Sequence, residues 1–306
     1  MRAEGFFKKN TNVFLIAMLC CLLWGSGIPG IKIGQQILHI EKDNISSLFL
    51  FAGVRFAFAG IIGLFCAKIL LKKWPVPQKA DWHMILKVSL FQTVVQYTLM
   101  YIGTANSTGI KSSIMGSAGN FIVILLACFV FRQEPFTKSK ALGCILGFTS
   151  IVVINFSKGN IGESMTLAGE GAVFLSSVSY AIARVLTKQY SQQMSPAVLS
   201  GYQFFVGGVA LTLIGISTGG SIKVASFAGS FIILYLAIVS AISFLLWSLL
   251  LKYNPISKVS IYGIMIPVFS VLISAIILRE GAQVNWVQTA CALFFACSGI
   301  MEINRN

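Results

Sequence analysis

An arginine inside an apolar segment is the residue of this chain that most directly suggests chemistry. Arg55 lies about eight residues into the apolar segment 47–71, roughly 12 Å along a helix that rises 1.5 Å per residue. A charge at such depth in a bilayer costs on the order of 2.5–3.5 kcal/mol, so we expect a compensating interaction. Two interpretations stay open: Arg55 binds a substrate carboxylate in a cavity, or it reaches outer headgroups or a backbone carbonyl.

Paired polar side chains mark two further apolar segments. Gln92 and Gln96 are four residues apart, so a helix places both amides on one face, followed by Tyr97. Ser243 and Trp247 have the same spacing in the second half of the chain. Amides that face lipid lack hydrogen-bond partners. These side chains are therefore expected either to line a cavity or to bond between helices.

Aromatic residues accompany these polar positions. Their rings can stack on an aromatic or apolar substrate or cover an organic cation, although Trp and Tyr also form belts at membrane interfaces. The aromatic candidates for substrate binding are Trp24, Tyr97, Tyr180, Tyr202, Trp247 and Tyr262. Asn120 lies in the middle of an apolar segment and has no reason to face lipid, so it joins the candidate site.

Several charged residues and two prolines lie near segment ends or breaks. Lys32 and Lys111 either form a cationic outer vestibule with Arg55, opposed by Glu170, or anchor helices at the interface. Pro29 and Pro267 weaken their helices, and each is either a gate for alternating access or a static kink.

Other end residues are expected to have structural roles. Arg184 and Lys188 are interpreted as topology signals at the inner end of a segment. Glu134 and Glu280 are interpreted as structural locks that pair with nearby cations, namely Arg132 or Lys138 for the first and Arg279 for the second.

Composition decides the class of protein. The 306 residues are 56% hydrophobic and only 10% charged, whereas soluble domains carry about 25% charged residues. The chain is therefore predicted to be an all-α integral membrane protein, and its excess of 23 Lys and Arg over 9 Asp and Glu is attributed to topology rather than to nucleic-acid binding. No catalytic set, metal-ligand spacing or phosphate-binding loop occurs in the sequence, so we expect no enzyme activity, no metal and no cofactor.

Ten segments are long and apolar enough to span a membrane. They are 12–33, 47–71, 84–103, 107–131, 139–156, 167–188, 196–217, 228–249, 258–278 and 286–303. With the N-terminus inside, sixteen Lys and Arg fall on the inner side and six on the outer side. The positive-inside rule then predicts that both termini are cytoplasmic.

The two halves of the sequence resemble each other. A shift of 146 residues aligns 120–134 with 266–280, and a shift of 148 aligns 54–60 with 202–208, which makes the neutral Gln203 the counterpart of Arg55. Residues 1–160 and 161–306 are therefore predicted to be five-helix repeats. Because five is odd, the second repeat enters the membrane inverted, an architecture typical of secondary transporters with a midplane substrate site.

The pattern W-G-S-x-x-P-x-x-K from Trp24 to Lys32, the V-R-F at 54–56, and the apolar runs that end at Glu134 and Glu280 resemble the drug/metabolite transporter superfamily, and the EamA-type exporters in particular. The resemblance covers essentially the whole chain. It implies a 5+5 inverted-repeat fold in a prokaryotic cytoplasmic membrane and efflux of amino acids, related metabolites or toxic cations. One position departs from the repeat: Phe121 stands where the second half has Pro267, so a helix break at Pro267 is not expected in the fourth span.

The favoured function is export of small metabolites, amino acids or related zwitterions above all, because the intramembrane charge is cationic. Efflux of cationic drugs and transport of nucleotide-linked or lipid-linked sugars are the alternatives within transport. A lipid-modifying membrane enzyme would need clustered His, Asp or Glu, and a membrane scaffold would not need polar residues inside both halves. The expected partners are a small-molecule substrate and the lipid bilayer, and the sequence leaves open whether the unit is a monomer or a homodimer.

Overall fold

The computed structural model describes residues 2–41, 43–107, 112, 115–155, 166–223, 226–277 and 285–305. The regular secondary structure of this part is helical throughout. The first half contains α1 (Arg2–Lys8), α2 (Asn10–Ile37), α3 (Ile45–Leu71), α4 (Trp82–Ser89), α5 (Gln96–Ala105), α7 (Gly119–Leu125) and α8 (Lys138–Asn155). A π-helical turn at Leu90–Val95 joins α4 to α5, and another at Leu126–Val130 continues α7.

The second half follows the same order of elements. It contains α9 (Ala172–Tyr190), α10 (Pro196–Ser217), α11 (Phe227–Tyr253), α12 (Ile256–Ser260), α13 (Met265–Ile277) and α14 (Trp286–Ile303). A π-helical turn at Leu167–Gly171 precedes α9, and a 3-10 turn at Ile261–Ile264 separates α12 from α13. The break before α13 agrees with Pro267, whose nitrogen cannot donate a helical hydrogen bond to the carbonyl of Gly263.

Seven helices within the described residues are long and apolar enough to cross a membrane. They are Asn10–Ile37, Ile45–Leu71, Lys79–Ala105, Pro196–Ser217, Phe227–Tyr253, Ile256–Ile277 and Trp286–Ile303. A shorter apolar helix covers Met115–Val130, and α8 and α9 lie where the fifth and sixth spans are predicted. The chain is therefore a multi-pass membrane protein, while the count of ten spans stays a prediction.

Local signals explain where several of these helices begin. The side chains of Asn44, Ser226 and Asn285 each accept a hydrogen bond from a backbone N–H in the first turn of α3, α11 and α14. Such caps satisfy donors that the start of a helix leaves free. Pro196 occupies the first turn of α10, where the missing N–H is not needed.

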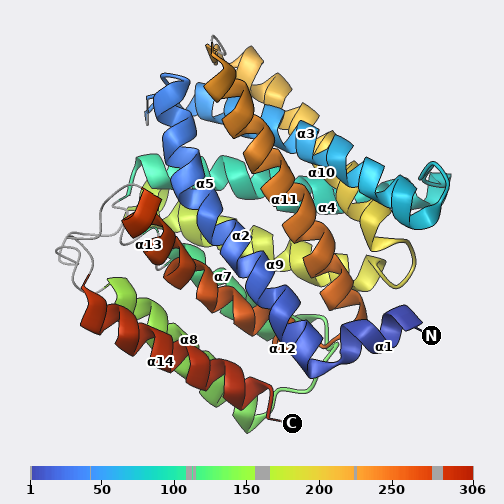
Figure 1. The fold of residues 1–306 in the computed structure, drawn as a ribbon, viewed down its shortest axis with the longest axis vertical. Coiled ribbons are helices and arrows are strands. Elements are labelled where there is room, and N and C mark those ends of the chain that lie inside the picture. Colours follow the sequence, from blue (N-terminus) through green and yellow to red (C-terminus); the bar gives the residue numbers. More distant parts are fainter. Residues whose placement is uncertain are drawn as a thin grey trace.

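The helices of the two halves are interleaved (Figure 1). α2 packs against α11 and α13, whereas α9 packs against α5 and α7. α3 pairs with α10, and α8 pairs with α14. The α3–α10 pair is close because a Cβ on Gly60 would collide with the backbone of Phe205, and one on Gly208 with the backbone of Ala57. Small residues at such crossings allow helix backbones to approach each other in a membrane.

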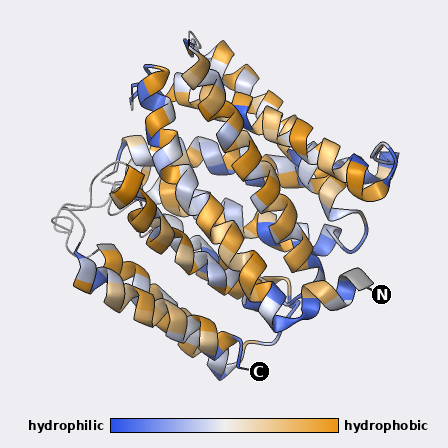
Figure 2. Cartoon of the chain, in the orientation of Figure 1, coloured by the Kyte–Doolittle hydropathy of each residue, from blue (hydrophilic) through white to orange (hydrophobic). Residues whose placement is uncertain are grey.

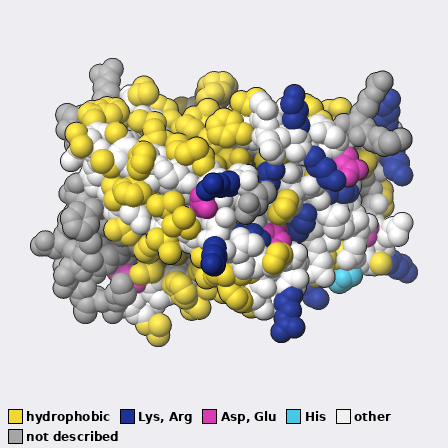
Figure 3. Space-filling view, turned by 90° about the horizontal axis from the view of Figure 1, so that it is seen from below, with side chains coloured by type: hydrophobic (Ala, Val, Ile, Leu, Met, Phe, Trp, Pro, Cys, Tyr) yellow, Lys and Arg dark blue, Asp and Glu magenta, His cyan; other side chains and the backbone are white. Residues whose placement is uncertain are grey.

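The polar material is concentrated at the ends of the bundle. Figure 2 shows hydrophobic residues along the lengths of the helices and hydrophilic residues mainly at their ends and connections. On the face seen in Figure 3, Lys and Arg side chains gather in the centre and on the right, and hydrophobic side chains cover much of the left. Both termini lie at the lower right end of the helices in Figure 1.

Trp24 stands where the two largest hydrophobic clusters meet. It packs against a cluster that includes Trp247 and Tyr262 and also against one that includes Phe204 and Phe244. The polar residues that approach Trp24 therefore lie deep within the bundle, between the two clusters.

Candidate functional site

A buried arginine surrounded by aromatic rings is the main feature of the interior. Arg184, on α9, exposes 2% of its surface. Its guanidinium carbon lies 4.8 Å from the ring centroid of Tyr180, 4.9 Å from that of Phe244, 5.0 Å from that of Trp24 and 5.4 Å from that of Trp247. We call Arg184 and these four aromatic residues the arginine box. It is built by α2, α9 and α11.

The interpretation of Arg184 as an inner-end topology signal is wrong. α9 continues to Tyr190, so Arg184 lies six residues before the end of the helix and about 6 Å further from that end than Lys188, at 1.5 Å per residue. Lys188 donates to the backbone carbonyl of Asn254 at 2.8 Å. The spacing of four residues from Tyr180 to Arg184 was the available signal, because it places ring and guanidinium on one helix face.

The polar groups of the box are mostly donors without partners. Arg184 Nε, the indole Nε1 atoms of Trp24 and Trp247, and the neighbouring Ser243 hydroxyl are all buried and without a hydrogen-bond partner. Within the described part of the chain, Arg184 makes no ion pair. Guanidinium and indole groups donate and do not accept. The unpaired set is therefore suited to an anionic group such as a carboxylate.

Arg55 forms a second buried cationic position. It exposes 4% of its surface, and its guanidinium carbon lies 4.3 Å from the Phe56 ring centroid and 5.9 Å from that of Tyr97. Its Nε is buried without a partner. A hydrogen bond from Arg55 to a backbone carbonyl is not found among the described residues, and its role in a substrate cavity stays a prediction.

Stacked phenylalanines connect the two arginines. Phe56 stacks on Phe204 with ring centroids 5.1 Å apart, and Phe204 meets Phe244 of the arginine box at 4.6 Å. These three rings were not predictable as site residues, because nothing in the sequence distinguishes them from the other phenylalanines among the 24 in the chain.

Other predicted site residues lie beside this core. Gln92 Nε2 donates to Gln96 Oε1 at 2.7 Å, which confirms that the two amides share a face. The Tyr180 hydroxyl contacts Asn120 Oδ1 at 3.4 Å. Asn120 also packs so closely on Gly263, in the 3-10 turn before α13, that a Cβ there would collide with its amide.

The remaining predicted residues fall elsewhere. Tyr202 packs edge-on against Trp82, and Lys32 is exposed, so neither joins the box. The buried Gln203 accepts from Thr93 Oγ1 at 3.2 Å, and the Tyr262 carbonyl accepts from the Cys21 thiol.

The proposed gate and vestibule residues are placed only in part. Pro29 is buried within the continuous helix α2, and Pro267 lies in the first turn of α13. The carboxylate of Glu170 accepts from Ser107 Oγ and the Thr166 backbone. Lys111, Arg279 and Glu280 lie outside the described residues.

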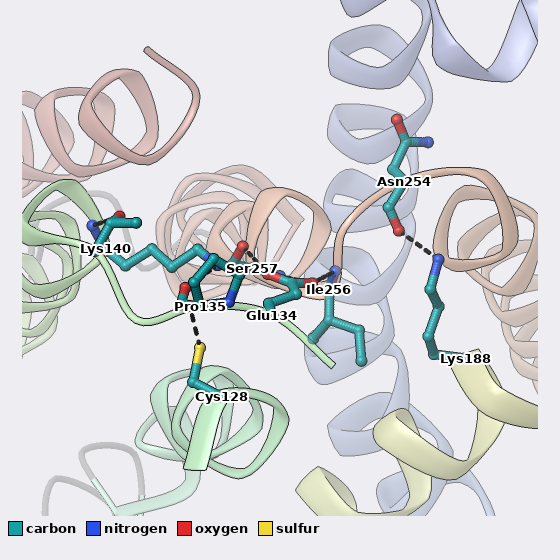
Figure 4. Close-up of polar contacts among 9 residues, drawn as sticks. Cys128, Glu134, Pro135, Lys140, Lys188, Asn254, Ile256 and Ser257 are labelled. Atoms are coloured by element: carbon teal, nitrogen blue, oxygen red, sulfur yellow. Dashed lines mark hydrogen bonds and ion pairs between the residues drawn. The ribbon is translucent and has the colours of Figure 1, made fainter. Parts of the chain in front are cut away.

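Glu134, from the first half, joins the two halves through hydrogen bonds to the start of α12 in the second half (Figure 4). Its Oε1 accepts from the backbone N–H of Ile256, and its Oε2 accepts from Ser257 Oγ at 2.5 Å. The predicted partners Arg132 and Lys138 are wrong, since Lys140 makes the ion pair at 2.8 Å. The carboxylate caps the start of α12, where it accepts hydrogen bonds from free N–H groups and its negative charge interacts favourably with the helix dipole.

Comparisons with known proteins agree with this fold. The sequence profile of the EamA-like transporter family matches residues 11–156 and again residues 167–304. The chain is 23% identical to the uncharacterized transporter YetK of Bacillus subtilis (strain 168), over 94% of this chain and 86% of that protein. It is 29% identical to an uncharacterized transporter of Archaeoglobus fulgidus, over 87% and 90% of the two chains, and 26% identical to protein PecM of Dickeya dadantii (strain 3937), over 88% and 86%.

A solved crystal structure has the same fold, with a TM-score of 0.76 at 16% identity, and covers 96% of this chain and 98% of its own. The match to the family covers most of both halves, and the apolar helices make the chain a multi-pass membrane protein. The chain belongs to the EamA-like transporter family and is a membrane transporter.

Proposed function

We propose that this protein exports small metabolites that carry a carboxylate, amino acids or related zwitterions among them, by alternating access at a cavity around the arginine box. The observation that carries the proposal is Arg184, a buried cation without a counter-ion among the described residues. A buried charge is tolerated when a partner compensates it. A substrate carboxylate that binds there would supply that partner.

The location of the box supports a transport role. Trp24 comes from the first half, and Tyr180, Arg184, Phe244 and Trp247 come from the second. A site shared by two halves changes its access when one half moves against the other. Arg55, on α3, offers a second cationic position linked to the box through Phe56 and Phe204.

The packing of the helices supports two inverted five-helix repeats within a ten-span bundle. The contacts of α2 with α11 and α13 have a counterpart in the contacts of α9 with α5 and α7. Such matching contacts are expected if a two-fold axis in the membrane plane relates the two halves. On this proposal residues 1–160 and 161–306 are the repeats, both termini face the cytoplasm, and the protein resides in the cytoplasmic membrane.

Counterflow in proteoliposomes tests the proposal. Liposomes are loaded with one unlabelled amino acid at a time, and uptake of the labelled compound is followed for the native protein, Arg184→Ala and the control Arg305→Ala, whose side chain is 77% exposed. We expect saturable exchange that Arg184→Ala abolishes and Arg305→Ala retains. Exchange that survives in Arg184→Ala would make Arg184 structural. Failure to exchange any amino acid would overturn amino acids as the substrate class, and carboxylates without an ammonium group, cationic drugs and sugar conjugates would then be compared in the same assay.

A further inference from the structure

The arginine box offers unpaired buried donors that suit a carboxylate, whereas none of the acidic side chains that the structure describes lies beside it to bind an ammonium group. An amino acid carries both, so a site built for amino acids usually needs an acceptor of negative or partial negative charge for the ammonium. The unpaired polar atoms in and beside the box belong to Arg184, Trp24, Trp247 and Ser243, and only the serine hydroxyl can accept a hydrogen bond.

Acidic side chains are remote from the box in the part of the chain that the structure describes. Glu4, Glu41 and Asp43 are exposed near the ends of α1 and α2, and Asp81 and Glu302 lie in the turn before α4 and the last turn of α14. Glu134 accepts a hydrogen bond from the start of α12 and pairs with Lys140. Glu170 accepts hydrogen bonds from Ser107 and Thr166. Neither arginine has any of these carboxylates as an ion-pair partner.

The aromatic rings of the arginine box do not provide a binding place for an ammonium group in place of a carboxylate side chain. A ring face attracts an ammonium group, but the four rings of the box already surround the guanidinium of Arg184 at 4.8–5.4 Å. A second cation bound there would be repelled by the first, and burial would strengthen the repulsion. Because these rings are apolar apart from the hydroxyl of Tyr180 and the N–H groups of Trp24 and Trp247, they favour a substrate whose remaining part is apolar or aromatic.

We infer that, among carboxylate-bearing metabolites, this transporter selects aromatic or apolar monocarboxylates that lack an α-ammonium group. The inference rests on the proposed function, because it takes the arginine box as the carboxylate site. The carboxylate accepts from Arg184 and the indole N–H groups of Trp24 and Trp247, and the apolar part of the substrate lies against the rings.

Three ligands of one size test this inference on the purified native protein in detergent. They are 3-phenylpropionate with only the carboxylate, phenylalanine with both groups, and 2-phenylethylamine with only the ammonium. Binding is measured by titration calorimetry at neutral pH, and the fluorescence of the half-buried Trp24 and the buried Trp247 gives a second signal. We expect 3-phenylpropionate to bind at least about tenfold more tightly than phenylalanine, a difference of ~1.4 kcal/mol, and 2-phenylethylamine not to bind.

The outcomes separate the inference from the proposed function. Phenylalanine binding as tightly as 3-phenylpropionate, or more tightly, overturns the inference and leaves the carboxylate site standing. Binding of 2-phenylethylamine alone, or of none of the three, overturns the carboxylate site as well. Arg184→Gln is expected to remove the difference between the two carboxylates, whereas the control Arg305→Gln is expected to keep it. Because the ligand comparison is made on the native protein, it decides the inference even if Arg184→Gln does not fold.

Discussion

The guanidinium carbon of Arg184 lies 5.0 Å from the centre of the Trp24 ring, although 160 positions separate the two residues in the sequence. Trp24 belongs to α2 and Arg184 to α9, the first long helix of each half. The candidate binding site is thus assembled by the contact between corresponding helices of the two halves, and its geometry depends on how the halves are joined.

Replacement of Arg184 by lysine keeps the charge but removes the planar fork that binds both oxygens of a carboxylate. The lost hydrogen bond to a charged group is worth ~1.5–3 kcal/mol, so we expect transport at low substrate concentration to fall about tenfold or more. Initial rates of exchange in proteoliposomes measure this, with Arg305→Lys as the matched control. An unchanged rate in Arg184→Lys would show that only positive charge matters at this position.

Substitution of Trp247 by phenylalanine keeps an aromatic ring in the box and removes one indole N–H. That N–H is buried without a hydrogen-bond partner, so its loss breaks no hydrogen bond within the described structure, while the smaller ring costs some stability because Trp247 is fully buried. We expect the half-saturating substrate concentration to rise about tenfold, with little change in maximal rate. Trp74→Phe, on an exposed residue that contacts Lys68, is the control. Equal half-saturating substrate concentrations for the two variants would show that Trp247 is not part of the binding site.

Glu134→Gln is expected to destabilise the bundle, because it removes the charge that holds Lys140 at 2.8 Å and caps α12. Both side chains of the ion pair are largely buried, at 12% and 10% exposure. Loss of hydrogen bonds to a charged group is worth ~1.5–3 kcal/mol. Thermal unfolding in detergent is expected to shift down, and the amides of Ile256 and Ser257 to exchange faster in hydrogen–deuterium exchange. Glu302→Gln, from a 3.9 Å pair with an exposed arginine, should leave both measurements unchanged; an equal shift would argue against the cap.

Gly208→Ala places a methyl group against the backbone of Ala57 at the α3–α10 crossing. Helix backbones cannot yield as a flexible side chain can, so the two helices must separate. We expect the stability to unfolding to fall by ~1–3 kcal/mol. Gly27→Ala is the matched control, since a Cβ on Gly27 meets no atom within 4 Å and alanine favours the helix. Equal melting temperatures for the two variants would show that α3 and α10 accommodate the methyl group without loss of stability.

The ends of the apolar segments were predictable from the sequence where clear local signals mark them. The segments 196–217 and 286–303 coincide with α10 and α14, because Pro196 and the cap Asn285 mark their beginnings. Gln92 and Gln96 were predictable as a pair because helical spacing alone brings them together.

The tertiary contacts were not predictable in the same way. Arg184 was misjudged because the distribution of Lys and Arg along the sequence does not show that the bundle buries this side chain, six residues before α9 ends at Tyr190. Lys140 was missed as the partner of Glu134 because the turn between them decides which cation reaches the carboxylate. Phe204 and Phe244 join the site only through packing between α10 and α11, which no local spacing encodes.

The interleaving of the halves has a consequence for biogenesis. α2 ends at Ile37, but its packing partner α11 does not begin until Phe227. At ~5–20 residues per second of synthesis, α2 waits on the order of ten seconds for that partner. During this time its glycines and the Trp24 indole face lipid or the insertion machinery. The nascent first half is therefore an incomplete folding unit, and the ribosome must deliver most of the second half before the first helix reaches its final neighbours.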